Sequence, residues 1–245
     1  MKIILRIQRF GPDSGDAPYF QEYPVDAAPS DRILDALLYV KQHQDATLAV
    51  RKSCGHGICG SDAMRINGTE RLACKTLVKD VAAGDGAIVT LQPLASMPVQ
   101  RDLMVDQSAF FDRYRSVRPF LIPAAPEAAP ARERIQTPQQ RTRFDDPTKC
   151  ILCGACFSSC PVVAGKNPGF VGPAAVIQAA RFIFDSRDKG IGERIGVLDS
   201  PDGAWACENH FNCTKVCPRG IKVTKSINET KKAITVAKES DHQTI

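Results

Sequence analysis

The chain has 245 residues and a net charge of +5, with 43% hydrophobic and 24% charged residues. This length allows one or two domains with buried cores, and no basic block dominates, so nucleic-acid binding is not expected. No apolar run approaches the roughly 18 residues that a membrane-spanning helix requires, and the N-terminus lacks a signal-peptide core. We therefore expect the ten cysteines to be reduced thiols that bind metal in the cytoplasm, rather than disulfides.

The N-terminal residues predict the start of a mixed domain. Apolar and polar residues alternate from Lys2 to Arg9, as in a strand, while residues 11–16 are expected to turn and Tyr19–Val25 to return as a second strand. Ser30 or Asp31 is expected to cap a helix. The apolar stripe of this helix would contain Ile33, Leu34, Leu37, Leu38 and Val40. Strand, strand and helix in this order are typical of a ubiquitin-like, or β-grasp, domain.

Residues 51–62 have most of the spacing of a plant-type [2Fe–2S] site, which is C-x4-C-x2-C with a distant fourth cysteine. Cys54 and Cys59 fill the first two positions, Asp62 stands at the third, and Cys74 follows a predicted strand at Ala63–Ile66 and an Asn-Gly turn. A carboxylate can bind iron, so we expect Asp62 to be the remaining ligand, with water or another nearby group as the alternative. His56 lacks the nearby C-x2-H partner of a Rieske centre and is expected to be a polar loop residue.

The next segments close this domain and lead away from it. A turn at 84–86 precedes a predicted strand at 87–91, and the domain is expected to end near residue 105. A short helix is predicted at 106–115. Residues 119–147 contain six prolines among alanines and charged residues, which indicates an ordered but irregular connector.

Two cysteine runs follow the connector. Cys150 to Pro161 reads C-x2-C-x2-C-x3-C-P, the spacing by which two-cluster bacterial ferredoxins hold their clusters. The fourth cysteine of such a run turns toward the second cluster, and the run from Cys207 to Pro218 ends in the same C-x3-C-P. The crossed pairing predicts a [4Fe–4S] centre held by Cys150, Cys153, Cys156 and Cys217, and a last centre held by Cys160, Cys207 and Cys213.

The last centre lacks one thiolate. Three thiolates favour a [3Fe–4S] cluster, and His210 stands at the missing position of the frame. His210 would either pack beside the cluster, which we expect, or donate a nitrogen to a fourth iron. Zinc is the alternative metal, but it would use four of these seven thiolates and leave the repeated C-x3-C-P ending unexplained.

The residues around the cysteine runs predict helices. Pro173 is expected in the first turn of a helix that continues through 174–185, and a final helix is expected at about 224–238. The predicted fold is α+β. A β-grasp plant-type [2Fe–2S] ferredoxin domain occupies 1–105, the helix and Pro-rich connector 106–147, and an all-α domain resembling two-cluster bacterial ferredoxins 148–245.

No sequence motif predicts a substrate site. The chain has no G-x-G-x-x-G after a predicted strand and no local signature of a nucleophile with its base. Its predicted chemistry is one-electron relay between clusters, so a two-electron cofactor would belong to a partner.

The order of motifs resembles the iron–sulfur subunits of succinate dehydrogenase and fumarate reductase (complex II) over nearly the whole chain. The residues that carry the resemblance are R-x-S-C-G-x-G-x-C-G at 51–60, Cys74, the run at 150–161, F-V-G-P-A-A at 170–175 and C-x5-C-x3-C-P at 207–218. An aspartate at the third plant-type position also occurs in that family.

The resemblance implies a place in a membrane-associated complex. Electrons would pass from a covalent-FAD flavoprotein that oxidises succinate through [2Fe–2S], [4Fe–4S] and [3Fe–4S] clusters, in that order. They would reach a quinone near the last cluster, in a pocket shared with a membrane-anchor subunit, at the cytoplasmic face of a bacterial inner membrane. Pro161 would lie near this pocket.

One departure from the family concerns the quinone. Many members carry a tryptophan pair shortly after the first C-P, whereas this chain has residues 162–168 without tryptophan and its single tryptophan at Trp205. This is more like members that use menaquinone with di-haem anchors. The alternatives to succinate oxidation are fumarate reduction, a heterodisulfide- or glycolate-type partner, a free soluble ferredoxin carrier and a zinc-stabilised interaction module.

Overall fold

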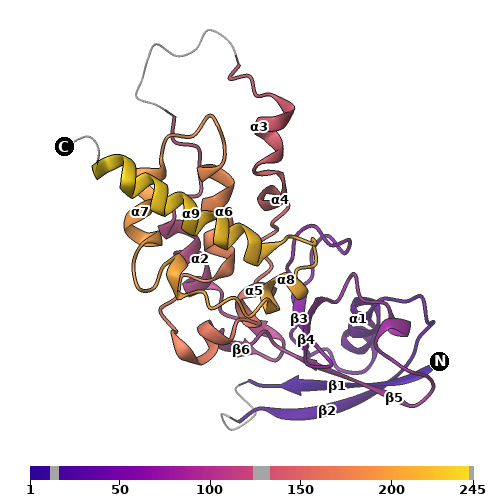
Figure 1. Ribbon diagram of the computed structural model, residues 1–245. Coiled ribbons are helices and arrows are strands. Elements are labelled where there is room, and N and C mark those ends of the chain that lie inside the picture. Colours follow the sequence, from indigo (N-terminus) through magenta and orange to yellow (C-terminus); the bar gives the residue numbers. More distant parts are fainter. Residues whose placement is uncertain (12–16, 124–132, 243–245) are drawn as a thin grey trace. The chain divides into compact units, whose positions relative to one another are not determined.

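The computed structural model describes residues 1–11, 17–123 and 133–242 (Figure 1). These residues form two compact units. Unit 1 contains the described part of 1–107 together with 151–159, and unit 2 contains the described parts of 108–150 and of the chain from residue 160 onward. The units are therefore not consecutive in sequence, because part of the first cysteine run belongs to unit 1.

Unit 1 is built around a mixed five-stranded sheet with strand order β2-β1-β5-β3-β4 (Figure 1). Its strands are β1 (Lys2–Arg9), β2 (Tyr19–Asp26), β3 (Ala63–Ile66), β4 (Thr69–Leu72) and β5 (Ala87–Gln92). The β1–β5 pair is parallel and the other pairs are antiparallel. Within the described part of 1–107, a two-stranded ribbon of β6 (Val99–Arg101) and β7 (Met104–Val105) and a 3₁₀ turn at Val78–Asp80 lie outside this sheet.

The predicted alternation and hairpin are confirmed. Ile3, Leu5 and Ile7 of β1 are buried, and β1 pairs antiparallel with β2 from Lys2 opposite Asp26 to Arg9 opposite Tyr19. The turn predicted at 11–16 falls largely on 12–16, which lie outside the described residues. The helix α1 (Ile33–His43) buries its predicted apolar stripe except for Leu38, which is half-buried. Unit 1 thus has the β-grasp order that the sequence predicts.

The predicted cap of α1 is wrong by one or two residues. The Asp31 carboxylate accepts the N–H of Ala28 at 2.7 Å, upstream of the helix. Arg32 is the N-cap residue, and its N–H donates to Asp35 Oδ2 at 3.0 Å. The backbone N–H at the N-cap is thus satisfied by Asp35, whose carboxylate lies at the third position of the helix.

Unit 2 is helical, as predicted. Its helices are α2 (Ser108–Ser116), α3 (Pro138–Thr142), α4 (Asp145–Thr148), α6 (Pro173–Ile183), α7 (Ile191–Leu198), α8 (Asn212–Lys215) and α9 (Val223–His242), with a π turn at Val162–Lys166 and a 3₁₀ turn at Ala204–Ala206. Helix α6 is buried from Pro173 through Ala180 and packs against α2, α4, α7 and α9. It therefore forms the centre of the unit 2 core.

The connector is more regular than predicted. Residues 124–132 lie outside the described part, but α3 and α4 fall within the segment expected to be irregular. Thr137 Oγ1 accepts the N–H of Gln140 at 3.2 Å, and Gln140 Oε1 accepts the N–H of Thr137 at 2.9 Å. With Pro138 in the first turn, this is a complete capping box.

Candidate iron–sulfur centres

The loop that carries Cys54 and Cys59 surrounds one sulfur with backbone amides. The N–H groups of His56, Ile58 and Cys59 point at Cys54 Sγ, at 3.5, 3.5 and 3.3 Å. Positive φ angles at the loop glycines make this inward turn possible. These hydrogen bonds lower the pKa of Cys54 to about 6, so the loop favours the thiolate that binds iron.

The hairpin of β3 and β4 brings Asp62 and Cys74 together. The strands pair from Ala63 opposite Leu72, and the N–H of Cys74 donates to Asp62 Oδ2 at 2.5 Å. Both residues are buried, Asp62 with 3% of its surface exposed. Burial, and then the neighbouring Asp62, raise the pKa of Cys74 to about 12. A metal cation would therefore be needed to hold Cys74 as a thiolate.

Cys74 lies close to Cys54 and to the loop that carries it. The Gly57 N–H donates to Cys74, and the Cys54 charge acts on the Cys74 thiol. Cys59 Sγ lies 3.1 Å from the Ser61 hydroxyl and also hydrogen-bonds to Cys54. The four residues predicted to hold the [2Fe–2S] centre thus come from one loop and the hairpin that follows it, and their donor set fits such a cluster.

His56 has a structural role in this loop. Its Nδ1 lies 2.7 Å from the carbonyl oxygen of Cys54, and the residue is exposed. The ring thus closes the loop on itself, in agreement with its prediction as a polar loop residue.

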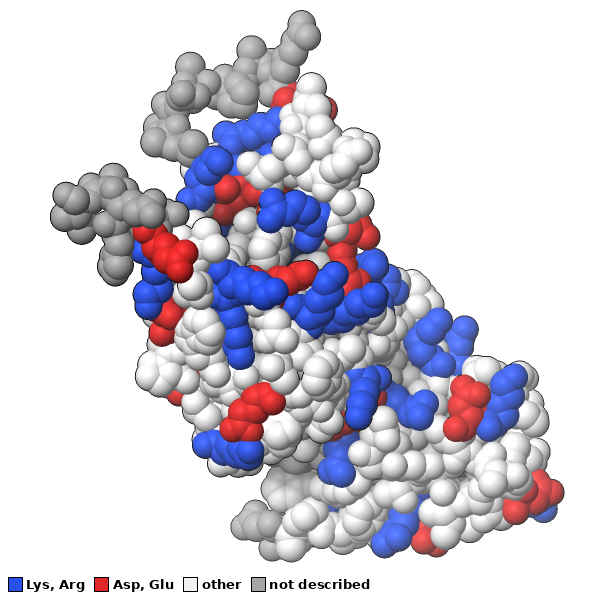
Figure 2. Space-filling model, in the orientation of Figure 1, with Lys and Arg blue, Asp and Glu red and all other residues white. Residues whose placement is uncertain are grey.

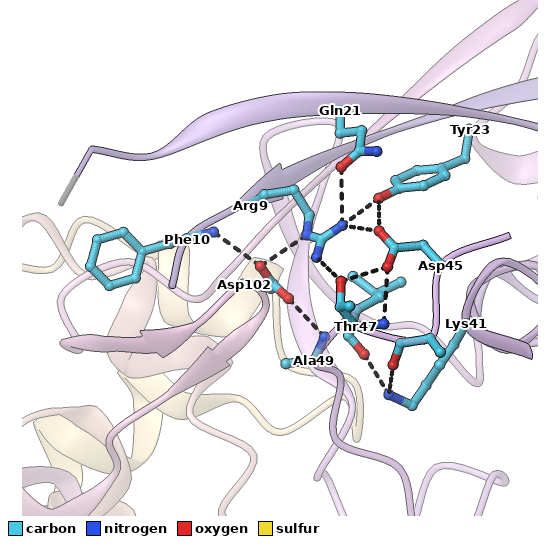
Figure 3. Close-up of polar contacts among 11 residues, drawn as sticks. Arg9, Phe10, Gln21, Tyr23, Lys41, Asp45, Thr47, Ala49 and Asp102 are labelled. Carbon is cyan, nitrogen blue, oxygen red and sulfur yellow. Dashed lines mark hydrogen bonds and ion pairs between the residues drawn. The ribbon is translucent and has the colours of Figure 1, made fainter. Parts of the chain in front are cut away.

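A buried ionic network holds the segment that leads into the loop (Figure 3). Arg9, with 5% of its surface exposed, donates from Nε to Asp102 Oδ1 at 2.9 Å. Its other nitrogens donate to Asp45, Thr47, Tyr23 and Gln21. Asp102 Oδ2 in turn accepts the N–H of Ala49 at 2.8 Å. The end of β1 is thereby tied to residues 45–49, which enter the cluster loop.

The electrostatics of this network follow from its burial. Burial opposes the Asp45 charge, but hydrogen bonds from Thr47, Tyr23 and Arg9 outweigh it and hold the pKa of Asp45 below its usual range. Burial and the hydrogen bond to Asp45 raise the pKa of Tyr23. No local sequence pattern predicts this network, because its members come from segments far apart in the chain.

The first cysteine run is divided between the units. Cys153 and Cys156 lie in the Ile151–Ser159 segment of unit 1, which includes α5 (Ala155–Ser158). Within unit 1, the Ser158 hydroxyl donates to Glu70 Oε1 at 2.9 Å. The Ser158 hydroxyl oxygen also accepts the N–H of Ala95, at 2.7 Å. These contacts fix the segment on β4 and on the residues after β5.

The other two ligands predicted for the [4Fe–4S] centre belong to unit 2. Cys150 follows α4, and Cys217 follows α8. That these two residues bind the same cluster as Cys153 and Cys156 stays a prediction.

The third cysteine set converges within unit 2. Cys160, Cys207 and Cys213 line one small cavity of about 20 Å³, together with Pro161 and Thr224. Burial raises the pKa of Cys160 and of Cys213. The Thr224 hydroxyl lies 3.5 Å from Cys213 Sγ, and Lys231 donates to the Cys207 carbonyl at 2.8 Å. Three thiols around one cavity fit the predicted last centre.

His210 lines this cavity but is bound to a carboxylate. Its Nε2 lies 3.0 Å from Glu208 Oε2, and Lys166 binds the same carboxylate oxygen. Lys166 and His210 together lower the pKa of Glu208. This contact favours a neighbouring role for His210 over iron ligation.

The single tryptophan lies beside this set. Trp205 Nε1 donates to Asp199 at 2.7 Å, and Lys231 Nζ lies 5.8 Å from the centre of the indole ring.

All ten cysteines are described, and none of them forms a disulfide. Within the described residues, no three His, Cys, Asp or Glu side chains are placed to hold a single metal ion.

Comparison with known proteins identifies both parts of the chain. Residues 4–112 match the family of 2Fe-2S iron-sulfur cluster binding domains, and residues 146–221 match the 4Fe-4S dicluster domain. The fumarate reductase iron-sulfur subunit of Mycobacterium tuberculosis is 40% identical over 230 residues, which cover 94% of this chain and 92% of that protein. The chain belongs to the family of iron–sulfur subunits of succinate dehydrogenases and fumarate reductases.

Two further relatives agree with this family. The succinate dehydrogenase iron-sulfur subunit of Coxiella burnetii is 36% identical over 237 residues, covering 96% of this chain and 97% of that protein. A chain of the Mycobacterium smegmatis Sdh1 complex in the apo form has a TM-score of 0.86 and 30% identity, with 97% of each chain covered. The fold predicted from the sequence is thus confirmed along nearly its whole length.

Two further observations concern the helices and the surface charge of the chain. In the described part of the chain, no helix is both long and apolar enough to cross a membrane. Figure 2 shows Lys and Arg side chains set among Asp and Glu side chains on the visible face. This mixture agrees with the absence of a dominant basic block in the sequence.

Proposed function

We propose that this chain is the electron-relay subunit of a succinate:quinone oxidoreductase. It would pass electrons from an FAD-containing flavoprotein through [2Fe–2S], [4Fe–4S] and [3Fe–4S] clusters to a membrane quinone. The observation that carries the proposal is how the thiols are placed. Backbone amides of the loop surround Cys54, and Cys160, Cys207 and Cys213 line one cavity. When bound, the clusters supply reversible one-electron transfer.

The proposed ligands differ in how the protein prepares them. Backbone amides hold Cys54 ready as a thiolate, and Asp62 is buried against the Cys74 amide. Burial raises the pKa of the Cys160 and Cys213 thiols, and metal binding favours their deprotonated form. Cys160 and Cys213 are buried and Cys207 is half-buried, and burial is one of the properties that set a reduction potential.

The proposed ligand sets follow the predicted ones. The [2Fe–2S] centre would be held by Cys54, Cys59, Asp62 and Cys74, the [4Fe–4S] centre by Cys150, Cys153, Cys156 and Cys217, and the [3Fe–4S] centre by Cys160, Cys207 and Cys213. Pro161 lines the cavity of the last set, and the quinone would bind near it.

The proposed partners are a flavoprotein that carries the FAD and a membrane anchor with or without haem, and the quinone would bind between the anchor and this chain. The chain itself would be a peripheral subunit at the cytoplasmic face of a bacterial inner membrane. Menaquinone is the quinone that the departure at residues 162–168 favours.

Fumarate reduction is the second candidate function. The relative from Mycobacterium tuberculosis carries that name, and the same ligands serve electron flow in either direction.

The test is to purify the chain with its associated subunits and supply succinate with an oxidised quinone analogue, or fumarate with a reduced one. Faster succinate oxidation supports the first function, and faster fumarate reduction supports the second. Purification of the chain as a stable cluster-containing monomer, without a flavoprotein, would contradict both.

A further inference from the structure

We propose that Gly60 is a positioning residue for electron transfer. Its missing side chain lets the loop of the [2Fe–2S] centre touch Cys153, a proposed ligand of the [4Fe–4S] centre. The inference rests on the proposed function, from which it takes the two ligand sets and the order of the clusters. Gly60 and Cys153 both belong to unit 1.

The contact leaves no room for a side chain. A Cβ atom on Gly60 would lie 2.7 Å from Cys153 Cβ and 2.9 Å from Cys153 Cα, well inside the ordinary contact that begins near 3.4 Å. The Ile151 carbonyl oxygen would be 3.2 Å away. These neighbours are backbone or Cβ atoms, which cannot rotate aside as the end of a long side chain can. Gly60 therefore permits an approach that no other residue allows.

The other side of the contact is fixed. The segment that carries Cys153 is held in unit 1 by Ser158, which bonds both Glu70 and the Ala95 amide. Gly154, with φ of +81°, packs against Met97 closely enough that a Cβ would lie 2.9 Å from Met97 Cε. A side chain at residue 60 would thus force the cluster loop away from an anchored segment, or pull that segment off its hydrogen bonds.

Gly60 links a proposed ligand of one centre to a proposed ligand of the other. It directly follows Cys59, a proposed [2Fe–2S] ligand, and it touches Cys153, a proposed [4Fe–4S] ligand. The route from ligand to ligand thus needs one backbone step and one van der Waals contact. Because the electron-tunnelling rate falls steeply with separation, the missing side chain at residue 60 helps to set the coupling of the two centres.

The test replaces Gly60 with alanine in the full chain loaded with clusters. With both centres reduced, the electron spin of the [4Fe–4S] cluster speeds the relaxation of the [2Fe–2S] signal, and this enhancement depends on their separation. We expect Gly60→Ala to keep both signals and to lose part of the enhancement. The matched control is Gly55→Ala in the same loop, with φ of +72° at Gly55 against +70° at Gly60.

The control separates strain from contact. A Cβ on Gly55 would meet nothing within 4 Å, so that variant carries the strained backbone alone and should keep the enhancement. Equal enhancement in Gly60→Ala and the unaltered chain would overturn the inference, and so would an equal loss in both variants.

Two other outcomes are also decisive. If Gly60→Ala does not assemble its [2Fe–2S] cluster, Ser158→Ala loosens the same contact from the other side. Loss of enhancement there supports the inference, and no change overturns it. Absence of either cluster signal from the unaltered chain would contradict the proposed ligand sets and overturn the inference with them.

Discussion

At the scale of single residues, Asp62 decides how far the plant-type pattern applies to this chain. Its carboxylate is buried and accepts the Cys74 amide, a placement that the spacing alone did not show. The cysteines were predictable from sequence because their spacing is tied to cluster geometry. Asp62 was predictable only as the residue that fills an incomplete set.

Asp62→Cys is expected to keep a [2Fe–2S] centre with an altered reduction potential, because a thiolate would replace an oxygen donor. Potentiometric titration followed by EPR measures the change. The matched control is Asp80→Cys, since the Asp80 carboxylate also accepts a backbone N–H, from Leu77 at 3.3 Å, but lies in an exposed turn. Spectra and potential that match the unaltered chain would show that Asp62 is not a ligand.

His210→Cys is expected to convert the last centre toward [4Fe–4S], because it completes the cysteine frame at a position that lines the cavity. The change also removes the contact with Glu208. EPR of the oxidised protein should then show a weaker three-iron signal. Lys215→Cys is the control and should keep that signal, because Lys215 is an exposed residue of α8 that does not line the cavity. Persistence of the full signal in His210→Cys would mean that residue 210 does not face the cluster.

At the scale of elements, the local patterns predicted most of what was found. The strand at Ala63–Ile66 and its Asn-Gly turn were predicted with the observed limits, because alternation and turn chemistry agree there. The helices α3 and α4 were not predicted, because the six prolines of this segment indicated an irregular connector and the Thr137–Gln140 capping box was not recognised. The Arg9 and Ser158 contacts could not be predicted, since each joins residues distant in sequence.

Arg9→Met is expected to lower the free energy of unfolding by about 3–5 kcal/mol, because it leaves the buried Asp102 and the half-buried Asp45 carboxylates without their cation. Thermal or urea unfolding of the cluster-loaded chain measures the loss. Arg115→Met is the control, because the Arg115–Asp112 pair on α2 is exposed and should contribute less than about 1 kcal/mol. Equal losses in the two variants would show that the Arg9 network does not stabilise the fold.

At the scale of the whole molecule, the two cluster-binding parts of the chain were predictable, but their limits were not. The sequence placed boundaries near residues 105 and 148, whereas the compact unit that contains the sheet also includes Ile151–Ser159. A boundary is read from composition, which changes at the prolines. Packing instead follows the Glu70–Ser158 hydrogen bond and the Gly60–Cys153 contact, and neither has a compositional signal.

Removal of iron is expected to destabilise the chain, because cluster binding contributes directly to folding free energy. In the cluster-free chain, Cys74 would be a buried protonated thiol whose pKa is about 12. The melting temperature measured by calorimetry should therefore fall after anaerobic chelation and recover on reconstitution with iron and sulfide. An unchanged melting temperature would show that the protein part folds without help from its clusters.

The central claim is that one chain holds three clusters of different kinds, and low-temperature EPR tests it most directly. The protein would be purified anaerobically with its associated subunits and reduced stepwise. We expect a [3Fe–4S] signal in the oxidised state, joined by [2Fe–2S] and [4Fe–4S] signals as reductant is added. An oxidised protein without that signal, in which two cubane signals grow on reduction, would contradict the three-thiolate centre and make His210 a candidate iron ligand.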